Sequence, residues 1–240
     1  MAPQPNPGAH ASPTGAASLW ERVIGTFSAR FRRARARRIM AMAPEIMKGR
    51  VCDLGGSLHF WEAVATILAP ADLTILNVRH DAQSKSHGGN SVHRVELYDG
   101  RVIPYPDAHF DVLLCNSVIE HVSPPLRAAL CADMRRVARR VIVQTPAYAF
   151  PVEPHFVMPF IHWLPRAAAR RLAHVSPWRL LSRPSTAHIN AYFSEITLLR
   201  RTELQALLPQ ARIVTERFAA LPKSYLAVIA PETGAAQPAA

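Results

Sequence analysis

The most informative segment of the chain reads Arg50-Val51-Cys52-Asp53-Leu54-Gly55-Gly56-Ser57-Leu58-His59-Phe60-Trp61. Residues 50–54 are a short apolar run with one carboxylate, and two glycines follow at once. Over residues 61–68 the apolar side chains take helical spacing. A strand, a glycine turn and a helix in succession open many nucleotide-binding α/β sheets, because glycine lets the backbone approach a ligand closely. A glycine pair after a strand is also a common tight turn, so the rest of the chain must decide.

Beyond this segment, strands and helices alternate. The predicted strands are at 50–54, 73–78, 92–97, 110–116, 140–145, 212–218 and 224–230, and the predicted helices are at 19–43, 61–68, 125–138 and 202–208. The last helix is predicted to start with a capping box at Thr202. Such alternation indicates an α/β domain with a mostly parallel sheet and right-handed crossovers.

Composition divides the chain into further parts. Residues 1–18 are rich in proline, alanine, glycine and serine, and we expect them to be disordered, as we do the tail at 231–240. Residues 19–47 form a predicted basic N-terminal helix, and residues 48–230 form the remaining domain.

Positive charge is concentrated in the predicted N-terminal helix. The net charge is +11, and residues 21–50 carry nine Lys or Arg against two Glu. This excess indicates either peripheral contact with a membrane or another anionic substrate through residues 19–43, or a helix whose basic face is simply solvated. The apolar residues of the helix recur at four-residue steps, at Leu19, Val23, Phe27 and Phe31.

The alternation stops between Pro146 and Tyr192. This segment is dense in proline, histidine and aromatic residues. A long insertion inside a compact domain usually covers a ligand, so we expect residues 146–192 to form a lid on the substrate side. Its aromatic side chains suit an apolar or ring-bearing acceptor, and they equally suit a small separate core.

The three cysteines are Cys52, Cys115 and Cys131. They have neither the spacing of a metal site nor the even number of a disulfide framework, so we expect buried thiols in a reducing compartment. The sequence shows no signal-peptide pattern and no apolar run long enough to span a bilayer, and we therefore expect a cytoplasmic protein.

The order of motifs resembles the class I S-adenosylmethionine-dependent methyltransferases, in the methyltransferase type 11 group, over about residues 48–230. The matching landmarks are Asp53-Leu54-Gly55-Gly56, Tyr98-Asp99-Gly100, Ile103-Pro104-Tyr105-Pro106-Asp107, Phe110-Asp111 and Asn116-Ser117-Val118-Ile119-Glu120-His121-Val122. The resemblance implies a Rossmann-like, mostly parallel seven-stranded sheet with helices on both faces. To this fold the chain adds an N-terminal helix and a lid insertion after the fifth strand.

The resemblance also implies S-adenosylmethionine as cofactor. Carried onto this sequence, the residues that bind the cofactor in the family are Asp53, Gly55, Gly56, Ser57, Asn77, Asp99 and Asn116. The chain departs from the family where Ser57 and His59 replace later glycines of the first motif. It departs again where Asn77 replaces an acid, which exchanges a charge-assisted hydrogen bond to the ribose for a neutral one.

Catalytic candidates follow from the chemistry of methyl transfer. A direct displacement needs orientation of the reactants and, for a hydroxyl acceptor, a base near its proton. Such a group lies at the carboxyl ends of the strands in an open α/β sheet. We expect His155 to be this base and Glu153 to orient it or contact substrate, because residues two apart in an extended segment share a side. The same pair could instead only pin the lid by hydrogen bonds.

The sequence does not predict a metal site. Some ubiquinone-pathway O-methyltransferases bind a divalent cation through Glu-x-x-Glu-His. Glu120-His121 matches the end of that motif, but Ser117 stands at its first position.

These observations predict an S-adenosylmethionine-dependent methyltransferase that acts on a small-molecule or a lipid- or sugar-linked acceptor. A nicotinamide oxidoreductase is disfavoured because residues 55–60 lack Gly-x-Gly-x-x-Gly. Two alternatives stay open: a non-catalytic protein that keeps the fold, given the reduced glycine motif, and a nucleic-acid methyltransferase, given the charge. Specific nucleic-acid binding is not expected, because no Pro-Pro-aromatic sequence follows Asn116.

Overall fold

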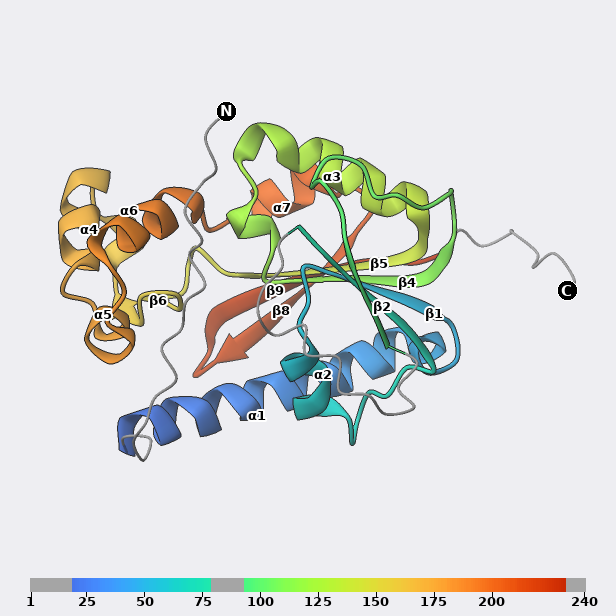
Figure 1. Ribbon diagram of the computed structural model, residues 1–240, viewed down its shortest axis with the longest axis horizontal. Coiled ribbons are helices and arrows are strands. Elements are labelled where there is room, and N and C mark those ends of the chain that lie inside the picture. Colours follow the sequence, from blue (N-terminus) through green and yellow to red (C-terminus); the bar gives the residue numbers. More distant parts are fainter. Residues whose placement is uncertain (1–18, 79–92, 232–240) are drawn as a thin grey trace, which may run out of the picture.

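The computed structural model describes residues 19–78 and 93–231 (Figure 1). The segments 1–18 and 232–240, which the sequence predicts to be disordered, lie outside the described residues. Val92, the predicted first residue of the third strand, also lies outside them.

A seven-stranded sheet forms the centre of the molecule, in the order β3-β2-β1-β4-β5-β9-β8. Its strands are β1 (Arg50–Leu54), β2 (Asp72–Asn77), β3 (His93–Leu97), β4 (Phe110–Asn116), β5 (Ala138–Pro146), β8 (Arg212–Phe218) and β9 (Leu221–Ile229). The first five are parallel, and β9 runs antiparallel to both β5 and β8. The predicted mostly parallel, Rossmann-like sheet is therefore confirmed.

The predicted bounds agree with the structure in three of the seven strands. The bounds of β1, β4 and β8 match the prediction to the residue. β5 is longer than predicted, because Ala138 already pairs with Phe110 of β4 and Pro146 still pairs with Ser224 of β9.

Helices cover both faces of the sheet (Figure 1). α1 (Leu19–Met42) and α2 (Leu58–Val64) lie on one face, and α3 (Pro124–Val137) and α7 (Arg201–Leu207) lie on the other. Each pair packs on its own buried cluster, with Ile39 and Trp61 on the first face and Met134 and Leu204 on the second. No helix in the described part of the chain is both long and apolar enough to cross a membrane.

Three of the four predicted helices begin elsewhere than predicted, α3 by a single residue, at Pro124 instead of Pro125. α2 starts at Leu58 rather than Trp61, because Ser57 caps it and accepts a hydrogen bond from the Phe60 amide at 3.4 Å. α7 starts after Arg200, whose amide donates to the Glu203 carboxylate at 2.6 Å. The capping box predicted at Thr202 is therefore wrong by two residues, and Thr202 lies inside the first turn.

The insertion forms a separate body beyond the carboxyl ends of the parallel strands (Figure 1). Its elements are β6 (Val152–Glu153), β7 (Met158–Pro159), the 3₁₀ turn η3 (Ile161–Trp163), α4 (Arg166–Ala173), α5 (Pro177–Ser182) and α6 (Thr186–Glu195). Phe156 and Ile189 are buried in a core of its own, against which Trp178 and Tyr192 pack. Most of the aromatic residues of the insertion thus pack within this body.

The three cysteines lie where the sequence places them. Cys52 is in β1, Cys115 in β4 and Cys131 in α3, and all three are buried free thiols. Burial raises the pKa of Cys131 to about 11, so this thiol stays protonated near neutral pH.

Candidate functional site

The turn after β1 can be built only with glycine. Gly55 has a φ of +72°, and a Cβ there would lie 2.5 Å from a methyl carbon of Val118. A Cβ on Gly56 would lie 1.8 Å from the Asp53 carboxylate, which folds back beneath the turn. The Gly55 amide donates to the Leu76 carbonyl at 2.8 Å, which ties the turn to the end of β2. The two glycines therefore let Val118 and the Asp53 carboxylate pack directly against the backbone of the turn.

Asp53 is a buried carboxylate directly under this turn. Its Oδ2 accepts a hydrogen bond from the Trp61 indole N–H at 2.7 Å, while Oδ1 is buried without a hydrogen-bond partner among the described residues. Burial raises the Asp53 pKa to about 7, and the bond from Trp61 opposes that rise. An unpaired buried oxygen at this position fits a ligand that brings a cationic or N–H group, such as the ammonium of a bound amino acid.

The ends of β2 and β3 complete the same edge. The Asn77 side-chain N–H₂ donates to the Gly56 carbonyl at 2.9 Å, and the Tyr98 amide donates to the Asn77 carbonyl at 2.9 Å. Asp99 follows in an exposed turn, where its carboxylate accepts from the Arg101 amide at 2.9 Å. The turn at residues 53–57, Asn77 and Asp99 are thus brought together, as a nucleoside site at this edge requires.

Asn116 belongs to a different network. Its side-chain oxygen accepts a hydrogen bond from Arg35 of α1 at 2.8 Å. The same guanidinium, buried with 7% of its surface exposed, donates to Gln144 at 2.9 Å and to Glu216 at 3.1 and 2.9 Å. Asn116, which the resemblance assigns to the cofactor site, therefore also contacts the N-terminal helix through its side-chain oxygen.

Arg35 was not predicted to be buried, although the sequence carries a signal for its burial. The apolar residues of the helix recur in steps of four up to Phe31, and the same steps continue through Arg35 to Ile39. Arg35 therefore lies on the buried stripe, and the surface charge of this part of the helix comes from exposed arginines, which are Arg30, Arg33, Arg37 and Arg38.

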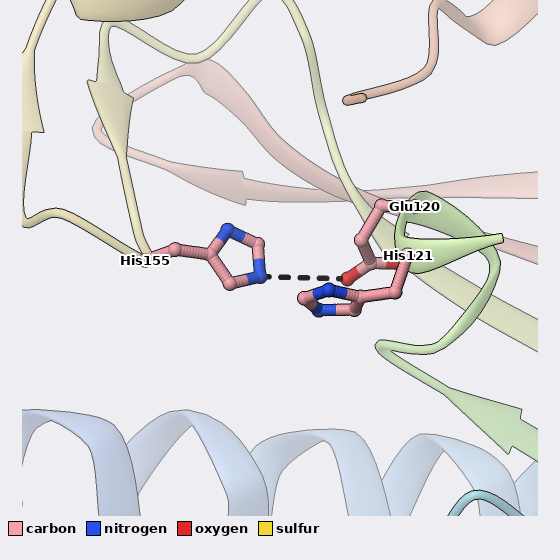
Figure 2. A group of neighbouring side chains, drawn as sticks. All are labelled: Glu120, His121 and His155. Atoms are coloured by element: carbon pink, nitrogen blue, oxygen red, sulfur yellow. Dashed lines mark ion pairs between the residues drawn. The ribbon is translucent and has the colours of Figure 1, made fainter. Parts of the chain in front are cut away.

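The predicted catalytic pair lies at the carboxyl edge, next to the segment that follows β4. His155 Nδ1 is 2.5 Å from Glu153 Oε1, and the other carboxylate oxygen of Glu153 accepts from the Phe156 amide at 2.7 Å. His155 Nε2 lies 4.0 Å from Glu120 Oε1. Glu120 and His121 belong to the 3₁₀ turn η2 (Ile119–His121), and Figure 2 shows His155 pointing from the opposite side toward their side chains.

The charges in this cluster are coupled. Burial raises the pKa of Glu120, and the nearby His155 opposes that rise. Burial would lower the pKa of His155, but the hydrogen bond and charge of Glu153 and the charge of Glu120 outweigh it and leave that pKa raised. The pair of carboxylates therefore favours a positive charge between them.

Tyr192 joins the lid to this cluster. Its ring lies 5.8 Å from that of His121 and 5.9 Å from that of His155, and the two histidine rings are 4.9 Å apart. Tyr192 comes from α6, so a helix of the lid forms part of the wall around the catalytic pair. The sequence assigned no role to this contact, because nothing local in α6 marks it.

The glycine turn is connected through one short segment to the cluster formed by Glu120, His121, Glu153 and His155. Val118 touches the position of a Gly55 Cβ, and Glu120 lies two residues further along the same chain. Ser117, at the start of this segment, has a φ of +56° and donates its hydroxyl to Gln144 at 2.9 Å. The structure therefore places the glycine turn beside the segment that contacts the Glu153–His155 pair.

A family model described as "Methyltransferase domain" matches residues 55–141. This range runs from the glycine turn to Val141 in β5. Apart from Asp53 and Leu54, it contains the landmarks on which the resemblance to type 11 methyltransferases rests. The resemblance is confirmed for this segment. No curated protein has a significant sequence match to the chain.

Solved methyltransferase structures share the fold of most of the chain. Magnesium protoporphyrin IX methyltransferase from Synechocystis PCC 6803, with bound SAH, superposes with a TM-score of 0.54 and 11% identity, covering 89% of this chain and 88% of that one. The N-terminal domain of EvdMO1 with SAH bound gives 0.50 and 17%, with coverages of 84% and 81%. An S-adenosylmethionine-dependent methyltransferase from Mesorhizobium loti gives 0.52 and 13%, with coverages of 80% and 94%. At these identities the likeness establishes the fold.

Proposed function

We propose that this protein is an S-adenosylmethionine-dependent methyltransferase that acts by direct displacement on a small-molecule or a lipid- or sugar-linked acceptor. One observation carries the proposal: the glycine turn and the Glu153–His155 pair lie at the same sheet edge, linked by the segment between Val118 and Glu120. The family match over residues 55–141 and the fold shared with proteins solved with bound SAH support it.

The residues of the first edge suit this cofactor. When bound, S-adenosylmethionine supplies a methyl group on a positively charged sulfur. Gly55 and Gly56 let Val118 and the Asp53 carboxylate pack directly against the turn, and the unpaired oxygen of Asp53 can accept from an ammonium group. The Asn77 amide, which already positions Gly56, also offers an oxygen that can accept from a ribose hydroxyl.

The second part of the site handles the acceptor proton. Glu153 accepts from Nδ1–H of neutral His155, which leaves the lone pair on Nε2 toward Glu120. A proton taken up at Nε2 would be stabilised by the buried charge of Glu120. His155 is therefore suited to receive a hydroxyl proton as the acceptor oxygen bonds to the methyl carbon.

Calorimetric titration with S-adenosylmethionine and SAH tests the first part of the proposal. We expect saturable binding of both ligands to the full chain. No heat and no thermal shift at millimolar ligand would instead identify a protein that keeps the fold without the cofactor.

The role of His155 is tested by turnover once an acceptor is in hand. His155→Ala should lower turnover by about 10²–10⁴-fold while cofactor binding survives. His174→Ala is the matched control, because His174 lies in the same lid but contacts Asn190 instead of the cluster. Equal turnover in the two variants would contradict a proton-accepting role.

A further inference from the structure

Three potential metal ligands meet in the catalytic cluster. Glu120, His121 and His155 each place one ligand atom within 4.8 Å of the other two (Figure 2). Two of them come from η2 after β4, and the third comes from the segment after β6. Their side chains point toward one another from two sides of the site.

Glu120 gives a second, independent indication of a ligand. Its side chain is fully buried, and Oε2 accepts from the Thr145 hydroxyl at 3.0 Å. Oε1 faces the cluster and finds no hydrogen-bond partner in residues 19–78 or 93–231, with His155 Nε2 at 4.0 Å. A buried carboxylate oxygen without a hydrogen bond is costly, and a bound cation would remove that cost.

The pairing of Glu153 with His155 is the arrangement that metal-binding histidines use. A ligating histidine usually donates its second ring N–H to a carboxylate, which fixes the tautomer and the ring. His155 does so at 2.5 Å, and Glu153 is itself held by the Phe156 amide. Nε2 is thereby directed at the cluster.

We propose that Glu120, His121 and His155 together bind a divalent first-row transition-metal cation, of which Zn²⁺ is the representative. One carboxylate and two imidazoles suit such ions, whereas Mg²⁺ and Ca²⁺ prefer sets made of oxygen alone. Bonds of about 2.1 Å would place tetrahedral ligand atoms roughly 3.4 Å apart, so small side-chain rotations suffice to close the cluster. Three protein ligands leave a fourth position for water or a substrate oxygen.

The catalytic consequence rests on the proposed function. An acceptor hydroxyl at the fourth position would lose its proton to water more easily, because the cation stabilises the oxyanion. The oxygen lone pair then bonds to the methyl carbon as the carbon–sulfur bond breaks and its electrons return to sulfur, with no change of oxidation state at the metal. On this inference the cation replaces His155 as the group that favours the ionised acceptor, and His155 serves as a ligand.

The cation is tested without cofactor or acceptor, on untagged full-length protein freed of metal by a chelator. We expect ZnCl₂ to bind at one equivalent in calorimetry, and CoCl₂ to give the visible absorption of a low-coordinate nitrogen and oxygen site. His155→Ala and His121→Ala should each remove this site, and Glu153→Gln should weaken it about 10–100-fold. His109→Gln is the control, because His109 precedes β4 at the opposite edge of the sheet.

Two results would overturn the inference. One is unchanged Zn²⁺ affinity in both folded ligand variants, and the other is wild-type protein that gives neither stoichiometric binding nor the cobalt spectrum. The spectrum of the wild type decides the matter even if a variant fails to fold. If the protein binds S-adenosylmethionine but no cation, this inference alone is refuted. If it binds the cation but not S-adenosylmethionine, the proposed function alone is refuted.

Discussion

Removing the Arg35 guanidinium should both destabilise the protein and loosen its active edge. Arg35 donates twice to Glu216 Oε2, at 3.1 and 2.9 Å, and once each to Asn116 and Gln144. Glu216 is 5% exposed, so Arg35→Met leaves a buried carboxylate without its main counter-charge. Breaking a buried pair in this way costs about 3–5 kcal/mol.

The lower end of that range applies here. Glu216 keeps a second ion pair to Arg38 at 3.0 Å and a hydrogen bond from the Ser224 hydroxyl at 2.5 Å. We therefore expect Arg35→Met to cost about 3 kcal/mol in urea unfolding, with a fall in Tm of roughly 6–12 °C. Arg37→Met, an exposed position in the same helix, is the matched control and should stay within about 0.5 kcal/mol of wild type.

The pH dependence supplies a sharper criterion. Burial would raise the Glu216 pKa, but the charge of Arg35, the hydrogen bonds from Ser224 and Arg35 and the charge of Arg38 lower it overall. A depressed folded-state pKa gives stability that is present above the unfolded value and lost as the pH falls through the folded one. Arg35→Met should therefore reduce the loss of unfolding free energy at acid pH, which is the acid limb of the stability curve. A cost below about 1 kcal/mol, or an unaltered acid limb, would refute the assigned network, and additive effects of Arg35→Met and Glu216→Gln would do so as well.

Three further predictions follow from the described contacts. Gly55→Val should abolish cofactor binding and destabilise the fold, because the side chain meets Val118 at a backbone φ of +72°; retained affinity for SAH would show the turn to be tolerant. The Asp53 pKa is raised to about 7, so the protein loses stability as the pH rises from the unfolded-state pKa of this carboxyl toward 7. Asp53→Asn should remove this loss, measured as the free energy of unfolding from pH 4 to 8, and should weaken cofactor binding. Parallel plots of stability against pH for wild type and variant would contradict the assignment. If the exposed basic face of α1 meets an anionic surface, as we propose, then Arg33→Gln with Arg37→Gln should reduce sedimentation with anionic vesicles, more so at low salt; equal binding by wild type and variant would exclude that role.

Much of the fold can be predicted from local patterns in the sequence. The runs at 50–54 and 110–116 are short, mostly apolar and bounded by polar or turn residues, so their strands can be read from composition alone. The glycine pair after the first run marks the turn because only glycine meets its backbone and steric requirements. Helix starts are less certain, since a cap such as Ser57 or Arg200 is recognised only when its hydrogen bond is known.

The candidate site was likewise predictable from the sequence only where the signal is local or follows from strand order. The edge that we propose to bind the cofactor was predictable, because the carboxyl ends of parallel strands meet at one edge of the sheet once their order is known. Within the local Glu153–His155 segment the sequence also indicated the pair that lies in contact.

Tertiary structure alone decided the contacts between distant residues. Arg35 and Glu216 are separated by 181 positions, and no local pattern distinguishes their pairing from that of other arginines in the same helix. Glu120 and His155 likewise meet only because the segments after β4 and β6 are brought to one edge. The sequence identified Glu120 and His155 as candidates, but not Arg35 or Glu216. Which side chains form a cluster of charges depends on what the open sheet and the packed insertion bring together, and that is a property of the folded chain as a whole.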